Sequence, residues 1–269
     1  MPLITDTPPP RPATDLFMQL PLKKTILLAA AAFAFSASCL AGEAQVAVAA
    51  NFAEPIKAVA AVLQKTTGHT LKITVGATGK LVAQIRNGAP FDVLLAADTQ
   101  APAQLEKDGL TQAGSRFTYA TGKLVLWSAD ATRVDPKGEV LKGGNFRKLA
   151  YANPKVAPYG SAAVQVMGQL GLATTLAPKL VQGESIGQTF GFVHTGNAEL
   201  GFVALSQVLE GGKLKSGSMW LVPQVLYAPI RQDAVVLQRG AANPAAQALM
   251  RLLISPNIQD LIRSYGYEL

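Results

Sequence analysis

The stretch "TVGATGKLVAQIRNGAPFDVLLAAD", residues 74–98, decides the predicted fold. A β-rich run ends in a glycine loop, a helical pattern follows, and the apolar run FDVLLAA is typical of a buried strand. The loop departs from a Walker nucleotide loop, because Gly76 lies too close to the Gly79 and Lys80 pair. A leucine then follows where a hydroxyl residue would ligate magnesium. The loop therefore raises the question of which other ligand a helix start of this kind holds.

The same alternation extends on both sides of this stretch. A buried strand at 45–50 and a helix ending at Gly68 precede it, so the order strand, helix, strand, helix, strand predicts a sheet with helices on both faces. A second α/β series follows a strand at 124–130, and two helices close the chain. We predict an α/β fold of two lobes, each a mainly parallel sheet flanked by helices. The predicted parts are an N-terminal extension with signal peptide (1–44), lobe 1 (45–122), lobe 2 (123–226) and a C-terminal return to lobe 1 (227–269).

The N-terminal region has the pattern of a bacterial secretory signal. Lys23 and Lys24 precede an apolar run at 26–35, and small residues that suit cleavage follow. We expect export to the periplasm and a mature chain that begins near Gly42 or Gln45. The single cysteine, Cys39, lies in this signal, so disulfides and cysteine nucleophiles are not expected in the mature protein.

The charge balance favours an anionic ligand. The chain has 24 Lys and Arg against 17 Asp and Glu, a formal net charge of +7. The basic residues are scattered without an aromatic-basic module, which disfavours nucleic acid as a partner. The two histidines are isolated and the serines lie in no recognisable catalytic motif, so neither a metal site of side chains nor an enzyme is expected.

Four loops have the character of anion-binding loops. Three follow predicted strands, AANFAEP (49–55), GATGKL (76–81) and NPKVAPYGSA (153–162), and a fourth, QGESIGQ (182–188), opens a helix with no obvious strand before it. Each offers free backbone N–H groups at a helix start, where the helix dipole favours negative charge. Converging loops of this kind would hold a dianion without a lysine as counter-ion.

Each loop residue also has a structural explanation. Asn51 with Glu54 fits a capping box, which needs no ligand. Thr78 is a candidate helix cap, and Tyr159 a candidate half-buried tyrosine. The residues alone leave these alternatives open.

Four segments together identify a resemblance: VAVAANFAEPIKAV, the stretch at 74–98, GNAELGFVALSQV and IQDLIRSYGY. They closely resemble the periplasmic molybdate-binding proteins of bacterial molybdate ABC importers, over nearly all of 45–269. The resemblance implies a type II periplasmic binding fold whose lobes close on molybdate or tungstate. It further implies delivery to the membrane permease of an ABC importer, no enzymatic activity, no cofactor and a monomer. GATGKL would then be an oxyanion loop.

The resemblance also implies the ligand residues. Asn51 occupies the first-loop ligand position, Thr78 a position where serine is usual, and Ile186 an aliphatic position that acts through its N–H, while Ala50 is a weaker backbone candidate. With Tyr159, these residues would contact molybdenum only through the oxygens of its oxyanion.

Two positions depart from the family pattern together. Many members have a small residue where this chain has Tyr159, and a tyrosine where it has Ala204. The Tyr159 phenol would replace the missing donor from the opposite side. The alternatives are a carrier of another tetrahedral oxyanion, such as sulfate or phosphate, or a secreted enzyme on the same scaffold. Molybdate and tungstate cannot be ranked, because their size and charge are nearly the same.

Overall fold

The computed structural model describes residues 41–269. The predicted extension, the apolar run and Cys39 lie outside the described residues. Within the described part, every helix is too short or too polar to cross a bilayer.

The first sheet has five strands in the order β2-β1-β3-β12-β4. Its strands are β1 (Glu43–Ala49), β2 (Thr70–Gly76), β3 (Val93–Leu95), β4 (Phe117–Gly122) and β12 (Ile230–Val236). β1 is parallel to β2 and β3, whereas β12 is antiparallel to β3 and β4. The sheet is therefore mixed, with its parallel part next to the first two loops.

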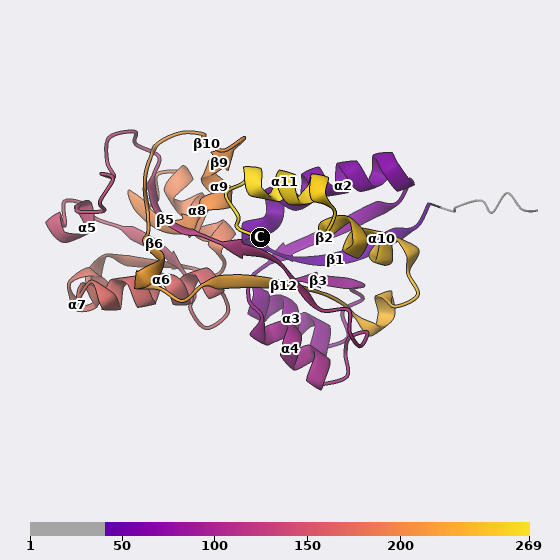
Figure 1. The fold of residues 1–269 in the computed structure, drawn as a ribbon. Coiled ribbons are helices and arrows are strands. Elements are labelled where there is room, and N and C mark those ends of the chain that lie inside the picture. Colours follow the sequence, from indigo (N-terminus) through magenta and orange to yellow (C-terminus); the bar gives the residue numbers. More distant parts are fainter. Residues whose placement is uncertain (1–40) are drawn as a thin grey trace, which may run out of the picture. The chain divides into compact units, whose positions relative to one another are not determined.

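Alternating side chains of β1 bury both faces of this sheet. Val46 and Val48 pack in one cluster with α2 (Ala53–Thr67), α10 (Pro244–Leu253) and α11 (Pro256–Ser264). Ala47 packs on the other face with α3 (Thr78–Arg86) and α4 (Gln100–Lys107). Figure 1 shows α2, α10 and α11 on one side of the strands and α3 and α4 on the other.

The second sheet has the order β11-β5-β8-β6-β7 and is also mixed. Its strands are β5 (Leu124–Ser128), β6 (Leu149–Ala152), β7 (Leu180–Gly183), β8 (Leu200–Ala204) and β11 (Ser218–Leu221). The helix α6 (Pro158–Gln169) packs on one face and α8 (Ile186–His194) on the other. Shorter elements complete the lobe: α5 (Val140–Gly143), α7 (Ala173–Leu176), α9 (Leu205–Val208) and the hairpin of β9 (Leu209–Glu210) and β10 (Lys213–Leu214).

The chain crosses between the sheets twice. It passes from β4 to β5 at Lys123, and it returns between β11 and β12. The two crossings lie side by side, because Gly122 pairs with Ile230. Two lobes joined by two crossings are the predicted two-lobe periplasmic binding fold, which is confirmed. The prediction of mainly parallel sheets is wrong, because each sheet has as many antiparallel as parallel strand pairs.

Several local predictions differ from the structure. The strands β4 and β7 and the helix α4 were not predicted, and β7 makes the fourth loop a strand-to-helix loop like the others. The predicted capping box is wrong: α2 begins at Ala53, and Asn51 lies in the 3₁₀ turn η1 (Ala50–Phe52) with no capping bond. Thr78 is not a cap either, because it is the first residue of α3. The half-buried tyrosine is wrong as well, since Tyr159 is 1% exposed in the first turn of α6.

Candidate functional site

A small cavity lies where the four loops meet. Its volume is about 10 Å³, roughly the space for one water molecule, so the lobes must shift to admit a larger ligand. It is lined by Ala49, Ala50, Asn51, Gly76, Ala77, Thr78, Ala97, Ala157, Pro158, Tyr159 and Ile186. The structure thus brings together all five residues singled out from the sequence. The lining contains no charged residue.

Backbone N–H groups are the first set of donors at this cavity. Each belongs to the first or second residue of a helix or 3₁₀ turn, where no intrahelical acceptor exists. None has a backbone acceptor within residues 41–269. They are the N–H groups of Ala50, Asn51, Thr78, Tyr159 and Ile186. The first three come from lobe 1 and the last two from lobe 2, so a ligand that binds all of them joins the lobes.

Two hydroxyl groups add side-chain donors. Thr78 Oγ1 accepts a hydrogen bond of 3.0 Å from the N–H of Ala97, and Tyr159 Oη accepts one of 3.1 Å from Gln232 Nε2. Because the protein donates to each oxygen, each hydroxyl hydrogen can turn elsewhere: to a ligand or, for Tyr159, to the neighbouring Tyr267 phenol. Burial raises the pKa of Tyr159 well above its ordinary value, so the phenol stays protonated at neutral pH.

Asn51 fixes the first loop through its side chain. It is buried, and its Nδ2 donates to Gln232 Oε1 (2.8 Å) and Tyr267 Oη (2.9 Å). Its backbone carbonyl accepts from Ser206 Oγ (2.8 Å) and Tyr267 Oη (2.9 Å). Asn51 Oδ1 is buried with no hydrogen-bond partner among the described residues. Since Nδ2 is occupied, the backbone N–H is the donor that Asn51 has left for a ligand.

Three residues of this network were missed by the sequence analysis. Ser206 was considered only as a nucleophile, and Gln232 and Tyr267 were not considered at all. They lie 155 to 216 positions from Asn51 in the chain and reach it only through the fold. Ser206 and Tyr267 lie in two of the segments that carry the family resemblance, GNAELGFVALSQV and IQDLIRSYGY, but their spacing from Asn51 gives no sign of the contact, and no motif marks Gln232.

The charged residues of the loops lie outside the cavity. Lys80 pairs with Glu184 across the lobes at 2.7 Å, and Glu54 pairs with Lys57, also at 2.7 Å. All four side chains are about half exposed or more. Lys80 therefore lies outside the cavity lining and is paired with a carboxylate.

The lobes touch around the cavity. Gly79 N–H donates to the carbonyl of Val156 at 2.9 Å, and a side chain at Gly79 would press on the Val156 backbone. Gly187 likewise lies against Ala50, because a Cβ there would come within 3.3 Å of the Ala50 methyl group. These glycines let the loops of the two lobes approach closely.

The remaining sequence candidates have structural environments. Ala204 is fully buried at the end of β8 and lies outside the cavity lining. His69 Nδ1 accepts from the N–H of Gly42, and His194 stacks on Phe190. In residues 41–269, no group of three or more His, Cys, Asp or Glu side chains is placed to hold a metal ion.

A small cavity between two α/β lobes, lined by uncharged residues from both, defines a solute-binding protein. The profile of the bacterial extracellular solute-binding protein family matches residues 44–268, so the chain belongs to that family. Two of its relatives are molybdate-binding proteins ModA. That of Azotobacter vinelandii is 56% identical, covering 91% of this chain and 97% of its own. That of Rhodobacter capsulatus is 52% identical, covering 84% of this chain and 88% of its own. The structure of the Azotobacter vinelandii periplasmic molybdate-binding protein superimposes with a TM-score of 0.82 at 41% identity, covering 84% of this chain and 99% of that one.

Proposed function

We propose that this protein binds molybdate between its lobes and delivers it to a bacterial ABC importer. The observation that carries this function is the cavity of convergent N–H and O–H donors without a charged side chain, in a chain 56% identical to a molybdate-binding protein. The protein is a binding protein rather than an enzyme. Molybdate is its transported ligand, and binding needs no cofactor.

The proposed ligand contacts are the N–H groups of Ala50, Asn51, Thr78, Tyr159 and Ile186, with the hydroxyls of Thr78 and Tyr159. Molybdenum would be held only through its oxygens. A hydrogen bond to a charged group contributes about 1.5 to 3 kcal/mol, and micromolar affinity corresponds to about 8 kcal/mol. Several such bonds therefore supply micromolar binding after the cost of closing the lobes.

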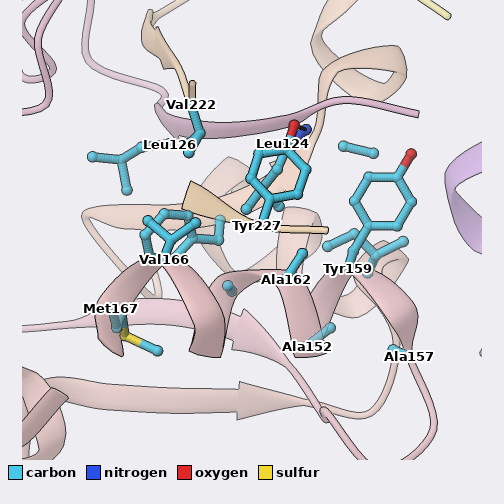
Figure 2. Close-up of a cluster of buried hydrophobic side chains, with 14 of the residues drawn as sticks. Leu124, Leu126, Ala152, Ala157, Tyr159, Ala162, Val166, Met167, Val222 and Tyr227 are labelled. Carbon is cyan, nitrogen blue, oxygen red and sulfur yellow. Dashed lines mark hydrogen bonds between the residues drawn. The ribbon is translucent and has the colours of Figure 1, made fainter. Parts of the chain in front are cut away.

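Tyr159 is proposed to compensate for Ala204. Many family members have a tyrosine at the position of Ala204, and alanine has no hydroxyl group to donate a hydrogen bond. Tyr159 enters the cavity from the first turn of α6 with a phenol that is held at its oxygen by Gln232. The ring stands at the start of α6, and its oxygen points away from the apolar side chains of the lobe (Figure 2).

The donors of the cavity predict selectivity for a fully deprotonated anion of the right size. Most phosphate at neutral pH carries a proton that needs an acceptor, and the free groups described above are donors except Asn51 Oδ1. Sulfate has no proton but is smaller, so its bonds to the same donors are longer and weaker. Tungstate matches molybdate in size and charge, and we propose that it binds as well.

Location and assembly are part of the proposal. We propose that residues 1–44 carry the export signal, that the mature protein is a periplasmic monomer, and that its partner is the importer's membrane permease. The lobe boundaries proposed are 45–122 with 227–269 for lobe 1, and 123–226 for lobe 2.

Isothermal titration calorimetry with four anions tests the function. Molybdate and tungstate are expected to bind with micromolar or tighter affinity, and sulfate and phosphate at least 100-fold more weakly, which is about 2.7 kcal/mol. Equal affinity for sulfate and molybdate would overturn the assignment.

A further inference from the structure

Gln232 joins the polar side chains of both lobes from behind the cavity. It is fully buried on β12 and is not among the lining residues. Its Oε1 accepts from Asn51 Nδ2 (2.8 Å) and Tyr119 Oη (3.0 Å), and its Nε2 donates to Tyr159 Oη (3.1 Å). One amide thus contacts a loop residue of lobe 1 and a helix-start residue of lobe 2.

The polarity of this amide decides where the Tyr159 hydrogen points. Gln232 Oε1 accepts from the Asn51 amide, so Gln232 Nε2 faces Tyr159. This Nε2 donates a hydrogen bond to the Tyr159 oxygen, which is the acceptor. Turning the Gln232 amide alone would place its NH₂ group against the NH₂ group of Asn51. The phenol hydrogen is therefore directed away from Gln232, toward the cavity or toward the neighbouring Tyr267 phenol, whose oxygen already accepts from Asn51 Nδ2.

We propose that Gln232 is a positioning residue of the anion site: its amide aims the hydroxyl hydrogen of Tyr159 at the bound anion. The proposal rests on the molybdate-binding function argued above. It adds that the Tyr159 bond depends on a residue that does not touch the ligand.

The competing arrangement has both amides turned over. Asn51 Nδ2 would then be free, and Tyr159 would give its hydrogen to Gln232. In the observed arrangement, Asn51 Oδ1 is buried without a partner. In the competing arrangement, the Asn51 NH₂ group would be buried without a partner instead. Unpaired buried donors are rarer in proteins than under-satisfied carbonyl oxygens, which favours the observed polarity.

Gly122 leaves the space that this hydrogen bond needs. It is the last residue of β4, and a Cβ at this position would overlap both Tyr159 Oη and Gln232 Nε2. Its backbone φ is not in the left-handed region, so the close approach, and not the backbone conformation, requires glycine. The space at the crossing between the lobes is therefore occupied by the Tyr159–Gln232 pair.

The test measures the cost of Tyr159→Phe in two backgrounds. Gln232→Glu keeps the size and the acceptor for Asn51 and Tyr119, but at pH 9 its carboxylate replaces the donor to Tyr159 by an acceptor. Burial raises the pKa values of Tyr119, Tyr159 and Tyr267, so these phenols stay protonated there. In the wild type, Tyr159→Phe is expected to weaken molybdate binding about tenfold or more. In the Gln232→Glu background it is expected to cost nothing further.

A matched control separates positioning from general destabilisation. Tyr227 is also a buried phenol, but its Oη accepts from Leu124 N–H and it lies outside the cavity lining (Figure 2). Tyr227→Phe is expected to have the same effect in both backgrounds. If Gln232→Glu does not fold in a thermal melt, Gly122→Ala serves as the background, since its methyl group displaces the same phenol.

The outcomes are distinct. If the wild type does not bind molybdate, the proposed function fails. If the wild type binds but Tyr159→Phe costs the same in both backgrounds, the function stands and the positioning role of Gln232 is overturned. If Tyr159→Phe is neutral in the wild type, the positioning role is likewise overturned, because the hydrogen does not reach the anion.

Discussion

The small cavity and the larger cleft beside it differ in the charge of the residues that line them. The cavity is lined by neutral residues, whereas the cleft, about 880 Å³ in volume, is lined in part by charged ones. These are Arg86, Asp98, Lys155 and Arg231. The two spaces share four residues, Thr78, Ala97, Ala157 and Pro158, so they are neighbours. The molecule thus keeps its charges beside the proposed anion site and lines that cavity with uncharged residues.

This separation has a physical basis. A buried lysine would carry a large desolvation cost and would attract any small anion. Backbone N–H groups at helix starts are already fixed by the fold, so they bind an anion with little rearrangement, and their directions select its shape. Charges in open solvent instead act at a distance, mainly on the rate of encounter.

A carboxylate placed inside the cavity is expected to have the largest effect on molybdate affinity. Thr78→Asp replaces a buried hydroxyl donor by a negative charge next to a dianion, which costs several kcal/mol. Calorimetry is expected to show at least about a 1000-fold loss of molybdate affinity. Thr78→Ser keeps the hydroxyl and is the control, expected within about threefold of the wild type. A tight-binding Thr78→Asp variant would mean that the anion does not occupy this cavity.

Removal of one neutral hydrogen-bond donor is expected to have the next largest effect on molybdate affinity. Tyr159→Phe deletes a single charge-assisted bond while it keeps the ring and the backbone N–H, so we expect a loss of about 1.5 to 3 kcal/mol, tenfold or more. The ring is buried, and its packing should survive, so the thermal midpoint of the unliganded protein should change little. Unchanged affinity in a molybdate titration would show that Tyr159 packs in the lobe without donating to the ligand.

Local patterns predicted the parts of the site that are local in the chain. Helix starts after loops indicated free N–H groups in all four loops, whereas the choice of Thr78 and Ile186 as ligand positions came from the family resemblance. The antiparallel strand β4 was missed because FTYATG is short and mixed in polarity, with Thr118 and Thr121 interrupting the apolar residues. The side-chain network was missed for another reason. Gln232 and Tyr267 reach Asn51 only after the chain has returned to the first lobe, and residue spacing carries no information about that contact.

The ion pair across the lobes should affect binding only modestly. Lys80 and Glu184 meet at 2.7 Å, but both side chains are about half exposed, and such pairs contribute little because water and salt screen them. Lys80→Ala is expected to weaken molybdate binding about twofold at low salt and not at all at 0.5 M salt. Lys57→Ala removes a comparable pair within α2 and is the control. A loss as large as that of Tyr159→Phe would mean that Lys80 acts as a counter-ion after all.

The smallest effect is expected from the exposed cations of the cleft. Lys155 and Arg231 line it without lining the cavity, so they should attract the dianion before the lobes close and hold none of it afterwards. In stopped-flow experiments, Lys155→Gln with Arg231→Gln should lower the association rate by less than about twofold at low salt and leave the dissociation rate unchanged. The difference should vanish at high salt, where the screening length falls to a few ångströms. Lys137→Gln with Lys213→Gln gives the same change of net charge at exposed positions outside the cleft, and should alter the rate less. If the dissociation rate rises instead, these side chains touch the bound anion, and the division between a charged cleft and a neutral cavity does not hold.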